Sequence, residues 1–315
     1  MTPTGILGAG SPVLAFDVGG TDTKAGLFDA DGTLREVVRV PTPYSVDGSG
    51  NAVLAQLGAL AQGFAARHPD LEPAAAGLIV PGLVDEETGT GVYAENLGWR
   101  DVPFRDAASA ALGVPVAFTH DVRAAGKAEY RLGAAGSYGN VVVVVIGTGI
   151  ASAIFLDGVP YSASGYAGEI GHAVIDPGGI ACACGGNGCL EAIASAGAIA
   201  RQYNALAAVP VAGAREVLDL AQAGDDIAVS VWNTATDALG LALSTVAALL
   251  APEAIVLGGG LAQAGPALFE PVERRMNSLL TFHRRPVLLP ATVGENAGLV
   301  GAALGARDRL TGAPA

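Results

Sequence analysis

The stretch Val13–Thr21, with the sequence VLAFDVGGT, decides the fold that we expect for this chain of 315 residues. Its first half predicts a short apolar strand, which runs into the turn Gly19-Gly20-Thr21. Ala25–Phe28 and Leu34–Val40 predict two further strands, turned at an Asp-Gly pair. The chain therefore opens with three antiparallel strands.

The same pattern occurs a second time in the middle of the chain. Val141–Ile146 predicts a strand, Gly147-Thr148-Gly149 a turn, and Ile150–Phe155 a returning strand that runs to another Asp-Gly pair. This duplication predicts two domains of related construction that face each other across a cleft. For a match this short, coincidence is the alternative.

The rest of the chain alternates helices with strands. Apolar residues at helical spacing predict a helix at Ala52–Arg67, and strands are expected at Gly77–Val80 and Val114–Phe118. The later elements are expected as helices at 193–206, 214–223 and 227–250, a strand at 254–257, a helix at 265–280, a strand at 287–289 and a helix at 296–306. We expect an α/β protein with a small domain at residues 1–120, onto which 296–315 packs back, and a large domain at residues 121–295.

Composition narrows the class of protein. Hydrophobic residues make up 51% of the chain and charged residues 15%, which excludes a disordered or fibrous class. The net charge of -13, without a cluster of Lys and Arg, predicts no nucleic acid partner. Met1–Ser11 has no basic residue, and Ala238–Pro252 is shorter than a membrane span. We therefore expect a cytoplasmic protein that is neither exported nor inserted in a membrane.

All three cysteines, Cys182, Cys184 and Cys189, fall within eight residues, and His172 lies just ahead of them. Three thiolates and an imidazole are suitable ligands for a closed tetrahedral zinc site. The alternative is three buried small side chains with an unrelated histidine, although cysteines used only for packing are expected to be scattered. A disulfide is disfavoured because the count is odd and Cys-x-Cys neighbours bridge badly. The cluster therefore predicts a metal site.

Three glycine-rich turns each follow a predicted strand, the third being Gly258-Gly259-Gly260. Glycine lets backbone amides approach phosphate oxygens closely, so the three turns together suggest a nucleotide site. None has P-loop or Rossmann spacing, and any one alone is typical of an ordinary tight turn. Asp17, beside the first turn, is suited to hold a magnesium-bound water; its alternative role is to cap the turn.

Asp121 is the candidate catalytic base. It follows a predicted strand and begins the predicted helix Val122–Arg131, where a carboxylate stays ionised and accepts a hydroxyl proton. Aspartate is also a common helix N-cap, which is the structural alternative. Glu169, His172 and Glu191 bracket the cysteines, and such a group of acceptors suits the hydroxyls of a sugar. Solvent-facing glutamates near a structural metal are the alternative.

Together these motifs resemble the ROK family of repressors, uncharacterised reading frames and sugar kinases, and its glucokinases in particular. The resemblance covers nearly the whole chain, through DVGGT at 17–21, GEIGH at 168–172, CACGGNGCLE at 182–191 and NAGLVG at 296–301. It implies the actin-like ATPase fold, which is ribonuclease H-like. It also implies an ATP-dependent kinase for the 6-hydroxyl of a hexose, with glucose expected first and mannose or N-acetylglucosamine as alternatives.

The resemblance further implies roles for single residues. Asp121 is expected as the base, a structural Zn²⁺ as the support of the sugar pocket, and ATP with Mg²⁺ across the glycine turns. The residues expected at the sugar are Gly82, Asn96, His120, Asp121, Glu169, His172 and Glu191. Those expected at the nucleotide are Asp17, Gly19, Gly20, Thr21, Lys24, Gly147, Thr148, Gly149, Gly258, Gly259 and Gly260. A homodimer is expected from the relatives.

Three places depart from the family pattern. His120 stands where most of the sugar kinases have Asn, which changes one sugar contact and bears on the preferred hexose. Asp22 stands where Lys is frequent, and Ala151-Ser152-Ala153 where Gly is more common, and both bear on nucleotide affinity. A sugar-responsive regulator is disfavoured because the first strand leaves no room before it for a helix-turn-helix. A sugar-binding module without catalysis is the third alternative.

Overall fold

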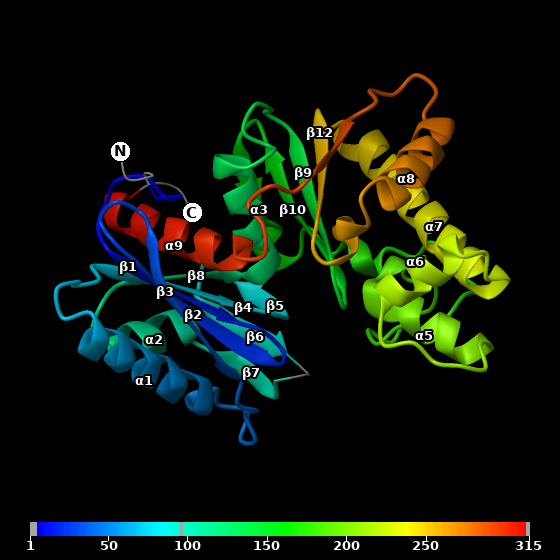
Figure 1. The fold of residues 1–315 in the computed structure, drawn as a ribbon. Helices are drawn as coiled ribbons and strands as arrows, with labels where there is room; N and C mark the ends of the chain where they lie inside the picture. The colour runs from blue at the N-terminus through cyan, green and yellow to red at the C-terminus, as the bar shows by residue number, and fades with distance from the viewer. Residues whose placement is uncertain (1–4, 95–96, 313–315) are drawn as a thin grey trace. The chain divides into compact units, whose positions relative to one another are not determined.

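The structure, a computed structural model, describes residues 5–94 and 97–312 (Figure 1). The chain divides into two units. Unit 1 comprises Met1–Gly133, Ser162–Ala167 and Val293–Ala315, and unit 2 comprises Ala134–Tyr161 and Gly168–Thr292. The domain boundary that we expect from sequence at residue 120 stays a prediction.

Unit 1 is built on a five-stranded sheet with the order β3-β2-β1-β4-β8. β1 (Val13–Val18), β2 (Asp22–Phe28) and β3 (Leu34–Pro41) are antiparallel neighbours. β4 (Ala75–Val80) pairs in parallel with β1, and β8 (Val116–His120) pairs in parallel with β4. The three opening strands predicted from sequence are confirmed.

Alternate residues of β1 enter two different cores. Phe16 packs with buried residues of α1 (Asn51–Arg67) and α2 (Phe104–Leu112), whereas Ala15 packs with those of α3 (Asp121–Leu132) and α9 (Ala297–Thr311). In Figure 1, α1 and α2 lie on one face of the sheet and α9 lies on the other. Successive side chains of a strand point to opposite faces, so a strand covered on both faces is apolar at nearly every position. The helices of unit 1 are α1 (Asn51–Arg67), α2 (Phe104–Leu112), α3 (Asp121–Leu132), the short η1 (Ala163–Gly165) and α9 (Ala297–Thr311).

Unit 1 also contains a small antiparallel sheet that the sequence did not predict. It consists of β5 (Leu83–Asp85), β6 (Thr90–Ala94) and β7 (Trp99–Val102). Helix α2 was not predicted either. Strands this short do not show a readable alternation of apolar and polar residues, so their pattern carries little signal.

Unit 2 repeats the topology of unit 1, with the strand order β11-β10-β9-β12-β13. β9 (Val141–Ile146), β10 (Ile150–Leu156) and β11 (Val159–Tyr161) are antiparallel neighbours. β12 (Ala254–Gly258) and β13 (Val287–Pro290) continue the sheet in parallel with β9. The order and the directions match those of unit 1 strand for strand, which confirms two domains of related construction.

Helices fill the connection between β11 and β12. They are η2 (Ile170–His172), α4 (Leu190–Ala194), α5 (Ala196–Leu206), α6 (Ala214–Gln222) and α7 (Asp226–Leu250), and η3 (Leu261–Ala264) and α8 (Pro266–Leu279) follow β12. The single helix predicted at Ile193–Leu206 is wrong. Ser195 has an extended backbone that ends α4, and its hydroxyl accepts the N–H of Ala198, 3.1 Å away, as the N-cap of α5.

Within the described ranges, α7 is the single helix long and apolar enough to cross a membrane. Half of its most apolar stretch, 50%, is buried inside the protein. Trp232 and Leu239 of α7 belong to the core of unit 2 together with Val272 and Met276 of α8. These contacts are those of a core helix, as the sequence predicts for this segment.

Candidate active site

Three parallel strands of unit 1 carry predicted site residues at or just beyond their carboxyl ends. Asp17 lies near the end of β1, Gly82 follows β4, and Asp121 follows β8 directly. The carboxyl ends of neighbouring parallel strands are the usual place for ligands in open α/β sheets. The structure therefore brings these three residues to one edge of the sheet.

Asp17 is placed between the sheet and the start of α9. Partial burial, and then repulsion from Asp121, raise the pKa of Asp17 to about 6, while Lys24 and Arg39 oppose the shift. A Cβ on Gly298 would lie 2.9 Å from Oδ2 of Asp17, so the glycine leaves room for the carboxylate. The sequence did not predict this approach.

The turn after β1 is closed by the main chain. The N–H of Gly19 donates to the carbonyl of Asp22 at 3.0 Å, so closure does not depend on the Asp17 side chain. Lys24 is the register partner of Asp17 on β2, and its ammonium lies 3.4 Å from the carbonyl of Glu295. The predicted residues Asp17, Gly19 and Lys24 are thus neighbours at one hairpin.

Asp121 is the first residue of α3 and does not cap it. The N-cap position belongs to His120, and no side chain makes a capping bond there. Oδ1 of Asp121 accepts the N–H of Val122 at 2.6 Å and lies 3.2 Å from Nε2 of His120. The Asp121 side chain is 34% exposed, so part of it is accessible to solvent.

A partly buried charge cluster, which the sequence did not predict, flanks the His120–Asp121 pair. The Glu86 carboxylate accepts hydrogen bonds from the hydroxyl of Thr119 and from Nε of Arg123, the latter at 2.8 Å. Arg123 also donates to the carbonyl of Val84 at 3.3 Å. Thr119 precedes the pair and Arg123 follows it, so both flanks are fixed. From the sequence alone, nothing about an Arg in the first turn of a helix indicates that it bonds to Glu86.

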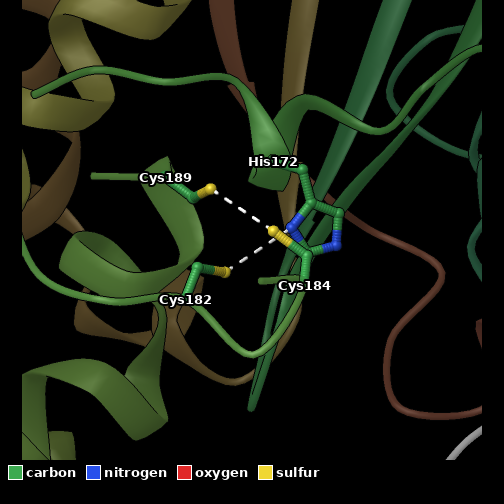
Figure 2. Close-up of side chains that lie close together, drawn as sticks. All are labelled: His172, Cys182, Cys184 and Cys189. Atoms are coloured by element: carbon green, nitrogen blue, oxygen red, sulfur yellow. Dashed lines mark hydrogen bonds between the residues drawn. The ribbon is translucent and has the colours of Figure 1, made fainter. Parts of the chain in front are cut away.

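Unit 2 brings the four predicted metal ligands together (Figure 2). Their ligand atoms all lie within 4.8 Å of one another. The sulfurs of Cys184 and Cys189 are 3.7 Å apart, and the Cys182 sulfur is 3.8 Å from Nδ1 of His172. Tetrahedral Zn–S bonds of about 2.3 Å place two sulfurs roughly 3.8 Å apart, whereas a disulfide needs about 2.05 Å. The donor set and the spacing fit zinc.

The cysteine loop depends on its glycines. Gly185 and Gly188 have φ angles of 91° and 67°, which side chains other than glycine rarely adopt. Burial raises the pKa of the Cys189 thiol to about 12, whereas the Gly186 N–H lowers that of Cys184. A metal ligand must be a thiolate, so binding would release the Cys189 proton.

The other two glycine turns lie at one edge of the unit 2 sheet. Gly147–Gly149 follows β9, and Gly258–Gly260 follows its parallel neighbour β12. Gly259 has a φ of 83° and approaches the main chain of Ile146, which is a packing reason for glycine. A Cβ on Gly147 or Gly260 would meet nothing within 4 Å, so the backbone there is open to a ligand.

Glu169 is exposed and lines a cavity of about 280 Å³ whose walls are mostly apolar. The N–H and the hydroxyl of Ser152 both donate to the carbonyl of Gly168, at 2.8 and 3.0 Å, which fixes the residue before Glu169. Glu191 lies at the start of α4, where Oε2 accepts the N–H of Ile150 at 2.8 Å. Asn96, also predicted at the sugar, lies outside the described residues.

The repeated sheet topology, with carboxylates at the edge of one copy and glycine turns at the edge of both, defines an actin-like ATPase fold. Within that fold the chain belongs to the ROK family, whose model matches residues 13–309.

Known proteins similar to this chain include sugar kinases. It is 30% identical to a glucokinase of Streptomyces coelicolor over 94% of this chain and 97% of that protein. It is 32% identical to an N-acetylmannosamine kinase of Yersinia pseudotuberculosis, over 94% and 99% of the two chains.

Solved structures agree with this assignment. A ROK hexokinase from Thermus thermophilus has a TM-score of 0.82 and 35% identity, covering 96% of this chain and 99% of that one. A ROK family glucokinase from Streptomyces griseus, in complex with glucose and AMPPNP, has a TM-score of 0.78 and 28% identity, covering 95% and 100%.

Proposed function

We propose that this protein transfers the terminal phosphoryl group of ATP to the 6-hydroxyl of a hexose, with glucose as the preferred substrate. The broader class, an ATP-dependent sugar kinase, is supported by the glucokinase relative and by the glucokinase structure with glucose and AMPPNP. The observation that carries the proposal is Asp121, a partly exposed carboxylate directly after β8 whose Oδ1 accepts the N–H of Val122 and lies 3.2 Å from Nε2 of His120.

In the proposed reaction, Asp121 takes the proton of the 6-hydroxyl as the sugar oxygen attacks the γ-phosphorus in line. The bond from this phosphorus to the β,γ-bridging oxygen breaks, and ADP leaves. His120 and the N–H of Val122 hold Oδ1, which orients Oδ2 toward the substrate. The amides of the glycine turns stabilise charge on the phosphates. Asp17 would hold a water of Mg²⁺, and the bound ion would supply positive charge at the transferring phosphoryl group.

The proposed sugar contacts are the acceptors around the metal cluster, Glu169, His172 and Glu191, with Gly82, Asn96 and His120. His172 faces the sulfurs through Nδ1, and its second ring nitrogen points away from them (Figure 2). That nitrogen is free to meet a sugar hydroxyl. The structural zinc, a homodimer, a cytoplasmic location and the lack of a nucleic acid partner belong to the same proposal.

The motifs that this chain shares with its relatives do not distinguish one hexose from another. One relative is an N-acetylmannosamine kinase, and His120 stands in place of the usual Asn. Hexoses other than glucose must therefore be tested as well. The experiment is ATP turnover with glucose, mannose, N-acetylglucosamine and N-acetylmannosamine, for the wild type and for Asp121→Asn. Asp106→Asn is the matched control, because Asp106 is a 74% exposed carboxylate on α2 of the same unit.

We expect turnover with at least one hexose, highest with glucose, that is lost in Asp121→Asn and kept in Asp106→Asn. Sugar binding without turnover in the wild type contradicts a kinase and selects a binding module. Turnover that survives in Asp121→Asn contradicts the assignment of the base.

A further inference from the structure

Glu191 makes a contact that sugar binding does not require. Its Oε2 accepts the N–H of Ile150, the residue directly after the turn Gly147–Gly149, at 2.8 Å. A Cβ on Gly149 would lie 2.5 Å from the same oxygen, yet Gly149 is not among the glycines with a positive φ. Glycine is therefore needed at position 149 because a side chain would clash with the Glu191 carboxylate, and not because the backbone has an unusual φ angle.

The same segment also holds the other end of the turn. The N–H of Ala196, the first residue of α5, donates to the carbonyl of Gly147 at 2.9 Å. Ser195 is fully buried and caps α5, which fixes the direction of this N–H. Thr148, between the two anchored ends, is exposed. Residues 191–196 thus support the turn from inside the unit and leave its outer side open.

This segment starts at the metal cluster. Cys189 is buried and is two residues before Glu191, and its sulfur lies 3.7 Å from that of Cys184. Leu190, between them, is 0% exposed and begins α4 in the core of unit 2. A displacement of Cys189 is therefore transmitted through two residues of packed backbone to the carboxylate that holds Ile150.

We propose that Glu191 is a positioning residue for the nucleotide turn Gly147–Gly149, through which the metal cluster organises phosphate binding as well as sugar binding. The inference rests on the proposed function, because it takes this turn as part of the ATP site. It predicts that nucleotide affinity depends on Glu191 and on the metal even when no sugar is present.

The test compares Glu191→Ala with Glu191→Gln by calorimetric titration of AMPPNP with Mg²⁺ and without sugar. Alanine removes the acceptor for Ile150, and we expect the Kd to rise about tenfold. The Gln side-chain oxygen still accepts this N–H, so the Kd of Glu191→Gln should stay within about twofold of the wild type. Hydrogen exchange at the Ile150 amide should accelerate in the alanine variant only.

Glu216→Ala is the matched control. Its carboxylate accepts the N–H of Ala212 at 2.9 Å, which is the same kind of contact elsewhere in unit 2. We expect it to leave AMPPNP affinity unchanged. Wild-type affinity in a folded, metal-loaded Glu191→Ala protein overturns the inference, and so does equal weakening in Glu191→Gln.

A second arm uses the wild-type protein after chelation, with its metal content measured. We expect AMPPNP affinity to fall by a factor similar to that of Glu191→Ala and to return when Zn²⁺ is added back. Undiminished affinity in the metal-free protein overturns the link to the metal. A wild-type protein that binds no AMPPNP at all contradicts the proposed function instead.

Discussion

The hairpins β1–β2 and β9–β10 have the same strand directions, but the carboxylate near their turns comes from different parts of the chain. The fifth residue of β1 is Asp17, whereas the fifth residue of β9 is Val145. The carboxylate that reaches the second turn comes instead from Glu191, beyond the cysteine loop. The first copy carries an acid in its own strand, and the second receives one from the segment that follows the metal cluster.

The connections between the third and fourth strands of each sheet differ in the same way. In unit 1 a single helix, α1, lies between β3 and β4. In unit 2 the corresponding connection holds η2, the cysteine loop and four helices, α4 to α7, besides the η1 segment that belongs to unit 1. A crossover between parallel strands tolerates such insertions because it lies outside the sheet. The cysteine loop and Glu191 thus lie in a connection that is much longer than its counterpart in unit 1.

The largest expected effect on ligand binding comes from removing the metal, because the cysteine loop is present in unit 2 alone. The proposed metal would be the common partner of Cys182, Cys184 and Cys189, so we expect the loop before Glu191 to lose its order without it. We expect sugar affinity to fall by more than about 100-fold. Calorimetry with glucose on a verified metal-free sample checks this, and unchanged binding contradicts the proposed site.

The next effect concerns the acid that only the first hairpin has. In Asp17→Asn the side chain keeps its volume but loses the charge that we propose to hold a magnesium-bound water. We expect kcat to fall roughly 50-fold with little change in the KM for sugar. Steady-state kinetics with varied Mg²⁺ measure this. An unchanged kcat would assign Asp17 a structural role only.

The pH dependence of stability follows from the same residue. The pKa of Asp17 is raised from 3.8 to about 6, so the folded protein binds this proton more tightly than the unfolded chain. Ionisation of Asp17 therefore lowers the free energy of unfolding as pH rises from about 4 to 6, by at most about 3 kcal/mol. Without Mg²⁺, Asp17→Asn should melt at a higher temperature than the wild type at pH 7 and at an equal one near pH 3.5.

The smallest expected effect is at His120. Asn in its place retains a donor near Asp121, so we expect kcat of His120→Asn to change by no more than about fivefold. The ratio of kcat/KM values between glucose and N-acetylmannosamine should change more than kcat itself. Equal ratios in variant and wild type would remove His120 from the sugar contacts.

Much of the fold was predictable because it depends on local signals. The apolar run Val141–Ile146, bounded by a glycine turn, predicts β9 within its observed bounds, and the repeat of that pattern predicts the second sheet. Ser195 shows the limit of such signals. In a run of helix-forming residues it reads as helix, but its hydroxyl caps α5 and divides the segment in two.

The candidate site was predictable where its residues cluster in sequence. The three cysteines and His172 fall within eighteen residues and do meet in space. Contacts between residues that are far apart in the sequence could not be predicted from it. No local pattern encodes the close approach of Asp17 to Gly298. The same holds for the hydrogen bonds from Arg123 to Glu86 and from Ile150 to Glu191, because these pairs are far apart in sequence.

The central claim is that a single carboxylate of unit 1, Asp121, is the base of the phosphoryl transfer. The most direct test is the single-turnover rate of Asp121→Asn with saturating hexose and ATP-Mg²⁺, beside its sugar Kd. We predict a rate about 1,000-fold below the wild type with a sugar Kd within about threefold. A rate within about tenfold of the wild type contradicts the claim.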